Sequence, residues 1–363
     1  MDTSLQRYPI PNELRDLLLE ELWKECVPDP KVSDAKLLST YLNYYSTRCQ
    51  HFSHDGGIHL CVKSHSNLAS VAKTILSDKT REEVCSSLGS PPSDPDIDRA
   101  RRANTTADLC ASLLLMAEAA AKEGVHNFGF SGSTPLTWSS QQTLRQAVNQ
   151  HFQPEHELQP DNPRLGKLFT ARNLSYIGGI KIKWTNNIVD HLLLSDDDQT
   201  VFIFHYAGYL QFQQSLQHPL FPTPFLTETL RTLALLFPQN SDRKSRRWLH
   251  GQIAEHNLDP VLARCGNLRA QTRRFEQFSF WRDRLVILKQ AFDESSPRGL
   301  TQWWNDRRNS VQWYTFWVAI LVFVMTVFFG LVQSIEGALQ VYISWKGEAG
   351  GAVDEGGGMG GVG

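Results

Sequence analysis

The densest group of side chains that could bind a metal lies in RCQHFSHDGGIHLCVKSH, residues 48–65. Zinc takes four nitrogen or sulfur ligands in a tetrahedron, and a Cys-x-His pair together with a His-x-Cys pair could supply them. These four candidates are Cys49, His51, His59 and Cys61, with His54, Asp55 and His65 beside them. The spacing matches no standard zinc finger, so a surface loop with scattered histidines is the competing interpretation. We therefore expect no metal and no cofactor.

A second polar group is DHLLLSDDDQ, which brings Asp190 and His191 near three consecutive aspartates, residues 196–198. Carboxylates grouped in this way can hold Mg²⁺ or Ca²⁺. An exposed hairpin turn also favours aspartate, and three in a row are typical of a solvated tip. Both interpretations are compatible with the sequence.

Recognisable enzyme motifs are missing from the sequence. GFSGS, residues 129–133, resembles the G-x-S-x-G elbow of hydrolases but has Ser133 where the second glycine is required. There is no G-x-G-x-x-G and no Walker phosphate loop. The basic run RKSRRW, residues 243–248, fits a nuclear signal, a nucleic-acid patch, a face near anionic lipid or a solvated helix start. A net charge of −2 gives no overall attraction to nucleic acid, and we expect no such partner.

The strongest signal is an apolar segment near the C-terminus, residues 311–332. Its 22 residues contain no charge, and as a helix it would be about 33 Å long, enough to cross a hydrocarbon core of about 30 Å. A buried core helix is the alternative, but such helices usually keep one polar face. Tryptophan and tyrosine, which prefer the membrane interface, cluster at both of its ends: Trp303, Trp304, Trp313, Tyr314, Trp317, Tyr342 and Trp345. The sequence therefore predicts a single-pass membrane protein.

The charges on either side of this segment predict its direction. Residues 241–310 contain 14 Lys and Arg against 8 Asp and Glu, whereas residues 333–363 contain one basic and four acidic residues. Cytoplasmic flanks carry the excess of positive charge, so the N-terminal body is expected in the cytoplasm. The first residues contain no secretory signal, which suggests insertion in the manner of a tail-anchored protein. Which membrane holds it is not evident.

Small residues recur at every fourth position along the predicted span. Such spacing lets two helices approach closely in lipid, and it predicts a homotypic or heterotypic helix contact through Thr326, Gly330, Ser334 and Ala338. A chance run of small residues is the alternative. Beyond the span, residues 333–346 have an apolar stripe typical of an interfacial helix or of a span extension. Residues 347–363 are glycine-rich and expected to be disordered.

The rest of the chain is expected to be mainly α-helical with a small β-hairpin or sheet. Proline-marked stretches at residues 86–98 and 153–163 predict linkers, which separate an N-terminal helical region (1–85), a second helical region (99–152) and a β-containing region (164–217). A basic helical region (218–310) leads to the span. The six cysteines form no C-x-x-C pair, which is typical of a reducing compartment.

Several individual elements can be placed. Thr80 and Glu83 match a capping box, and a helix over residues 141–152 is expected to begin after Ser140. Short strands are expected at residues 58–62, 180–184, 189–194 and 201–206, with the SDDDQ turn between the last two. Another helix is expected over residues 273–292.

Two C-terminal blocks, residues 303–319 (WWNDRRNSVQWYTFWVA) and 329–342 (FGLVQSIEGALQVY), are distinctive. Together with residues 107–117 (ADLCASLLLMA) and 182–192 (IKWTNNIVDHL), they resemble a group of filamentous-fungal proteins that have a C-terminal transmembrane segment and no assigned activity. The resemblance covers about half of the chain and excludes the glycine-rich end. It implies a membrane-anchored fungal protein and brings no catalytic residues.

These observations favour a membrane-anchored interaction or regulatory protein that binds the bilayer and a cytosolic protein partner. The alternative is a membrane-tethered enzyme of unrecognised class that uses residues 49–65 or 190–198. A third possibility is a subunit of an ion channel, although no charged side chain lies within the span to line a pore.

Overall fold

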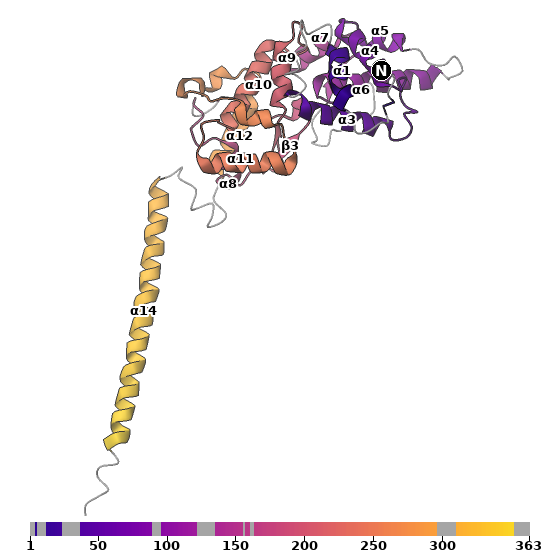
Figure 1. Ribbon diagram of the computed structural model, residues 1–363. Coiled ribbons are helices and arrows are strands. Elements are labelled where there is room, and N and C mark those ends of the chain that lie inside the picture. Colours follow the sequence, from indigo (N-terminus) through magenta and orange to yellow (C-terminus); the bar gives the residue numbers. More distant parts are fainter. Residues whose placement is uncertain are drawn as a thin grey trace, which may run out of the picture. The chain divides into compact units, whose positions relative to one another are not determined.

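The computed structural model describes residues 4–5, 12–23, 37–88, 96–121, 135–154, 157–159, 163–295 and 310–351. The chain divides into two compact units, residues 1–296 (the N-terminal unit) and residues 297–363 (the C-terminal unit). The predicted fold class is confirmed, because the chain is mainly helical with small sheets and has one long apolar C-terminal helix (Figure 1).

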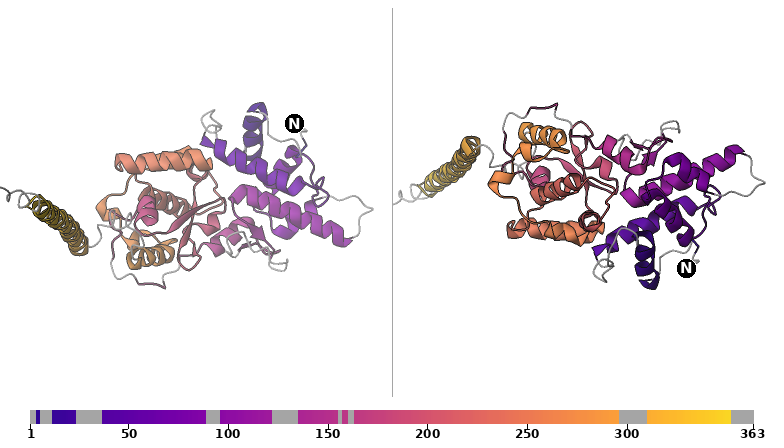
Figure 2. Two further views of the ribbon diagram at one scale, coloured as in Figure 1. Left: turned by 90° about the horizontal axis from the view of Figure 1, so that it is seen from below. Right: turned by 90° about the horizontal axis from the view of Figure 1, so that it is seen from above.

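Helices from the first part of the chain lie together at one end of the N-terminal unit (Figure 2). They are α1 (Asn12–Trp23), α3 (Ser39–Ser53), α4 (His65–Leu76), α5 (Arg81–Ser87) and α6 (Asp96–Leu115), followed by α7 (Leu144–His151). The apolar side of α4 contacts α1, α5 and α6, and α3 packs on α6. The helices on either side of the expected linker at 86–98 therefore pack on each other, while residues 89–95 lie outside the described residues.

Two of these helices begin at a capping box. The box at Thr80 and Glu83 is confirmed, with the Glu83 carboxylate accepting from the Thr80 N–H at 2.8 Å. The helix expected over residues 141–152 begins at Leu144 rather than directly after Ser140. A second box, formed by Thr143 and Gln146, satisfies the first backbone donors there, and so it fixes the start three residues later.

Residues 58–62 form turns and irregular chain, not the strand expected from their apolar character. The preceding Gly56 and Gly57 have φ of 82° and 69°, a left-handed conformation in the turn that follows α3. Turn geometry therefore overrides β-propensity here.

A three-stranded sheet has β5 (Thr200–Phe204) in its centre and the strand order β3-β5-β4. The strand β3 (Lys181–Thr185) pairs with β5 in parallel, and β4 (Leu194–Ser195) pairs with it antiparallel across the expected turn. The strand expected at 189–194 is not formed: its first two residues belong to the 3₁₀ helix η1 (Ile188–Asp190), residues 191–193 are turn and irregular chain, and only Leu194 lies in a strand. Two further short strands, β1 (Ala119–Ala120) and β2 (Leu136–Thr137), pair in parallel.

Later helices surround this sheet at the other end of the unit (Figures 1 and 2). They are α8 (Ala171–Tyr176), α9 (Ala207–Ser215), α10 (Thr223–Leu236), α11 (Arg243–His256) and α12 (Arg282–Glu294), with the 3₁₀ helices η2 (Pro260–Arg264), η3 (Ala270–Thr272) and η4 (Phe275–Gln277). α8 contacts β3, α12 contacts β4, and α9 packs on α10.

The single helix expected over residues 273–292 is divided into η4 and α12. The carboxylate of Glu228 on α10 accepts hydrogen bonds from three consecutive N–H groups, those of Ser279, Phe280 and Trp281, at 2.6–2.8 Å. These donors are thereby satisfied outside a helix, which lets the chain turn before α12 begins.

An aromatic cluster ties the two ends of the N-terminal unit together. Phe152, directly after α7, packs against Phe225 with ring centroids 4.3 Å apart and the rings tilted by 39°, and Phe225 lies 5.4 Å from Trp281. All three side chains are buried. The expected linker at 153–163 therefore starts directly after a residue, Phe152, that packs in the core of the later helices. Residues 155–156 and 160–162 lie outside the described residues.

The described part of the C-terminal unit is one helix, α14 (Ser310–Gly351). It is 42 residues long, or about 63 Å at 1.5 Å per residue. Residues 333–346 continue this helix without a break. Residues 352–363 of the glycine-rich tail and the aromatic and basic residues at 303–309 lie outside the described residues.

Candidate functional site

The structure does not bring the four candidate zinc ligands together. Cys49 points into the core and is 1% exposed, whereas His51 and His59 are exposed. His59 instead pairs with Asp55 at 3.1 Å. Among the described residues, which include all of 49–65, no three His, Cys, Asp or Glu side chains are grouped so that they could hold a metal ion.

Burial decides the chemistry of Cys49. It raises the pKa of the thiol to about 12, so the side chain is protonated at neutral pH and is not activated as a nucleophile. The sequence could not show this, because its periodicity does not reveal that α3 turns Cys49 inward and His51 outward.

The aspartates of residues 190–198 are also separated. Asp196, Asp197 and Asp198 form the exposed turn between β4 and β5, where all three have φ between 51° and 63°. Asp190 lies in η1 and is only 3% exposed. Asp196, Asp197 and Asp198 therefore form a solvated turn, whereas Asp190 is buried.

The structure describes one of the two remaining motifs, the basic run at residues 243–248. GFSGS, residues 129–133, lies outside the described residues. The basic run is the first turn and a half of α11, where Asp242 caps the helix and Arg243, Lys244, Arg246 and Arg247 are exposed.

A pocket of about 390 Å³ lies in the N-terminal unit where the helices of the first part meet the sheet. Its walls come from α3, from the residues before β1, from the carboxyl end of β3 and the segment that follows it, and from β5. The lining residues are Tyr44, Thr47, Arg48, His51, Ala117, Glu118, Trp184, Thr185, Asn186, Asn187, Asp190 and Phe202. It opens beside the carboxyl end of β3, which runs parallel to β5, and ligands in α/β sheets commonly bind at that end of the strands.

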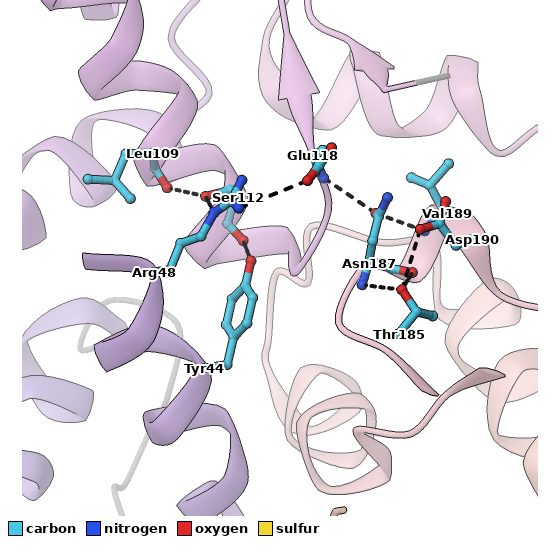
Figure 3. Close-up of polar contacts among 9 residues, drawn as sticks. All are labelled: Tyr44, Arg48, Leu109, Ser112, Glu118, Thr185, Asn187, Val189 and Asp190. Carbon is cyan, nitrogen blue, oxygen red and sulfur yellow. Dashed lines mark hydrogen bonds and ion pairs between the residues drawn. The ribbon is translucent and has the colours of Figure 1, made fainter. Parts of the chain in front are cut away.

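The floor of the pocket is a hydrogen-bonded loop, residues 185–190, shown in Figure 3. The Thr185 hydroxyl accepts from the Asn187 N–H at 3.0 Å and reaches Asp190 Oδ2 at 3.4 Å. Asn187 Oδ1 accepts from the N–H groups of Val189 and Glu118, at 3.2 and 3.3 Å. These bonds fix the loop and hold Glu118 beside it.

The opposite wall is formed by α3, which is hydrogen-bonded to the end of α6. The Tyr44 hydroxyl donates to the Ser112 carbonyl at 3.1 Å, and burial raises the pKa of Tyr44 to about 12, which keeps this hydroxyl a donor. Arg48 donates from Nε to Ser112 Oγ at 3.4 Å, and its Nη1 lies 3.9 Å from Glu118 Oε1. This ion pair is long and about a quarter exposed, so it contributes little stability (Figure 3).

Two polar atoms of the lining have no hydrogen-bond partner among the described residues. They are Asp190 Oδ1 and Trp184 Nε1, and both are buried. Arg284 lies nearby, but both of its hydrogen bonds from Nη1 go to backbone carbonyls, those of Val189 and His191. A buried polar atom left unsatisfied costs about 1–3 kcal/mol, so a partner that entered the pocket could recover this energy.

The sequence contains a signal for this site, although the pocket was not predicted from it. Thr185, Asn186, Asn187 and Asp190 follow an alternating strand directly, at the position where polar residues of parallel sheets meet ligands. That β3 is parallel to β5, and that Arg48 and Glu118 face this loop, depends on tertiary contacts that no local pattern encodes.

On α14 the four small residues of the predicted contact face are exposed, and a shallow groove lies beside them that includes Thr326, Phe329 and Gly330. The hydroxyls of Thr326 and Ser334 donate to carbonyls of their own helix, at 2.8 and 2.9 Å. A Cβ added to Gly330 would meet nothing within 4 Å. The fold of the described chain therefore does not itself require glycine at this position.

No family model, curated protein or solved structure matches the chain.

Proposed function

We propose that this protein is a membrane-anchored interaction or regulatory protein, with α14 crossing the bilayer and the N-terminal unit displayed in the cytoplasm. The observation that carries the proposal is the helix itself. Residues 314–346 form 33 residues of helix with none of the most apolar window buried. Large side chains such as Phe323, Leu331 and Val341 are 60–72% exposed.

Exposed apolar area of this extent is unfavourable in water, at about 25 cal/mol per Å². A bilayer removes that cost and needs about 20 residues to cross. Residues 314–335 contain no charged side chain, and Glu336 and Lys346 follow within the helix. The uncharged part therefore fits the hydrocarbon core, and the remaining turns extend into the interface on the far side.

The direction of insertion rests on the charges around the helix. The basic residues of 241–310 lie before it and the acidic residues after it, which favours a cytoplasmic N-terminal unit. The absence of a metal cluster among the described residues and the burial of Cys49 support a binding role over catalysis at the residues first considered.

The experiment is extraction combined with protease protection. Membranes that contain the full chain are washed with alkaline carbonate, and a chain that ends at residue 309 serves as the matched control. The proposal expects the full chain to stay in the pellet and the shortened chain to be released. Protease added to intact vesicles should digest the N-terminal unit and spare a fragment that contains α14. Release of the full chain by carbonate would overturn the anchor, and protection of the N-terminal unit would overturn its direction.

A further inference from the structure

We propose that the pocket at the carboxyl end of β3 binds a small organic ammonium compound with an aromatic or similar apolar body. The inference concerns the N-terminal unit alone and does not depend on the membrane anchor. It rests on three independent features: the charge of the lining, its unsatisfied atoms and its aromatic walls.

The charged side chains of the lining determine the sign of the ligand. Among the lining residues one cation, Arg48, faces two carboxylates, Glu118 and Asp190, and Arg284 interacts with Asp190 from outside the lining. Arg48 is also held in place, since it donates to Ser112 and stacks over Phe52 at 5.1 Å. Coulombic attraction in a partly buried site therefore favours a cation over an anion.

Asp190 gives the ammonium group its position. Oδ2 is within reach of Thr185, while Oδ1 has no partner among the described residues. A primary ammonium carries three donors, so one N–H could satisfy Oδ1 and another could reach Glu118 in competition with the 3.9 Å contact to Arg48. Hydrogen bonds between charged groups are about twice as strong as neutral ones, which makes Asp190 the main determinant of affinity.

Aromatic rings provide the site for the apolar body. Tyr44 and Trp184 are partly exposed on the pocket wall, and Phe202 closes it from β5. The faces of such rings attract cations and pack against planar groups. The unpartnered Trp184 Nε1 adds one donor, which suits a ligand that carries an acceptor oxygen on its body.

The test uses three small probes that share a benzene ring and differ in charge: phenethylamine, 2-phenylethanol and phenylacetate. Their binding to the full chain in detergent is measured by calorimetry and by the shift in thermal unfolding. We expect phenethylamine to bind at least about tenfold more tightly than the neutral alcohol, and phenylacetate to bind weakest. Equal binding of amine and alcohol, a preference for phenylacetate, or no binding of the amine at about 10 mM would each overturn the proposal.

Variants locate the site. Asp190→Asn keeps the size of the side chain and removes its charge, and we expect it to weaken amine binding by about tenfold or more. Glu118→Gln tests the second carboxylate at a position that is about a quarter exposed, so it should fold even if Asp190→Asn does not. Asp196→Asn, on the exposed turn, is the matched control and should leave binding unchanged. Amine binding that resists both Asp190→Asn and Glu118→Gln would place the ligand elsewhere and overturn the proposal.

Discussion

The imidazole of His191 accepts a hydrogen bond from the backbone N–H of Phe204, with 3.2 Å between Nδ1 and the nitrogen. Because Nδ1 must therefore be unprotonated, Nε2 carries the proton and donates to the Thr232 hydroxyl at 2.7 Å. His205 is held in the same way, since its Nδ1 accepts from the Asp259 N–H at 3.2 Å. Both rings are buried, and both hydrogen bonds require a neutral histidine.

The first prediction concerns pH. Burial lowers the pKa of His191 and of His205 to about 3, well below the usual 6.5. The stability that each contributes is fully present above pH 6.5 and is lost as the pH falls toward 3, up to ~5 kcal/mol each. Burial raises the pKa of Asp259 to about 6, because it disfavours the charged carboxylate. Asp259 therefore acts in the opposite direction: the stability that it contributes is present at low pH and is lost as the pH rises through about 6. On acidification the stability lost through the two histidines is larger than the stability gained through Asp259.

We therefore expect the free energy of unfolding of the full chain, measured with urea in mild detergent, to fall between pH 6.5 and pH 4. His205→Asn retains an acceptor for the Asp259 N–H but cannot titrate, so the dependence on pH should become weaker. His59→Asn, at a side chain that is 54% exposed, is the control and should keep the wild-type slope. Identical slopes for all three proteins would contradict the prediction.

The second prediction contrasts two glycines. A Cβ on Gly208 would lie 2.4 Å from the carbonyl oxygen of Leu37, which is backbone and cannot move away easily. Gly208→Ala should therefore destabilise the N-terminal unit by about 3 kcal/mol. Gly251 lies within α11 with nothing near its Cβ position, and Gly251→Ala should stabilise by up to about 1 kcal/mol. Urea unfolding of both variants provides the measurement. If both substitutions change the free energy of unfolding in the same direction, the close approach of Gly208 in α9 to Leu37 is contradicted.

The third prediction concerns Arg81, which is 1% exposed although it is charged. Its guanidinium donates to Asp108 at 2.7 Å and to Asn104 at 3.0 and 3.1 Å, and so joins α5 to α6. Arg81→Met removes the buried partner of a pair whose carboxylate is 28% exposed, and it should cost about 3 kcal/mol of unfolding free energy.

Arg274 provides the comparison for Arg81. Its pair with Glu276 is 3.9 Å long and largely exposed, so Arg274→Met should change the stability by less than about 1 kcal/mol. Thermal and urea unfolding distinguish the two variants. A small effect at Arg81 would show that α5 and α6 are held together by apolar packing alone.

The fourth prediction tests whether α14 associates with another copy of itself. Gly330→Ile places a branched side chain on the small-residue face, and we expect cross-linked dimers in vesicles to decrease several-fold. Val324→Ile enlarges a residue on a different face of the helix and should leave cross-linking unchanged. If Gly330→Ile and the wild type cross-link equally, the small residues of α14 are not a homotypic contact.

The sequence by itself determined the features that depend on local order along the chain. The length and apolarity of residues 311–332 predict a helix able to cross a membrane, because a run of this kind has no polar face for water. Thr80 and Glu83 predict a helix start, and residues 196–198 a turn, since caps and turns are encoded within four or five residues.

Only the tertiary structure decided which side chains share a site. Cys49 and His51 are two residues apart, yet one faces the core and the other solvent. Arg48, Glu118 and Asp190 are far apart in sequence, yet they line one pocket because α3, the residues before β1 and the loop after β3 converge. Parallel pairing of β3 with β5 sets the place of that loop, and such pairing depends on packing between distant segments, which hydrophobic periodicity along the chain cannot specify.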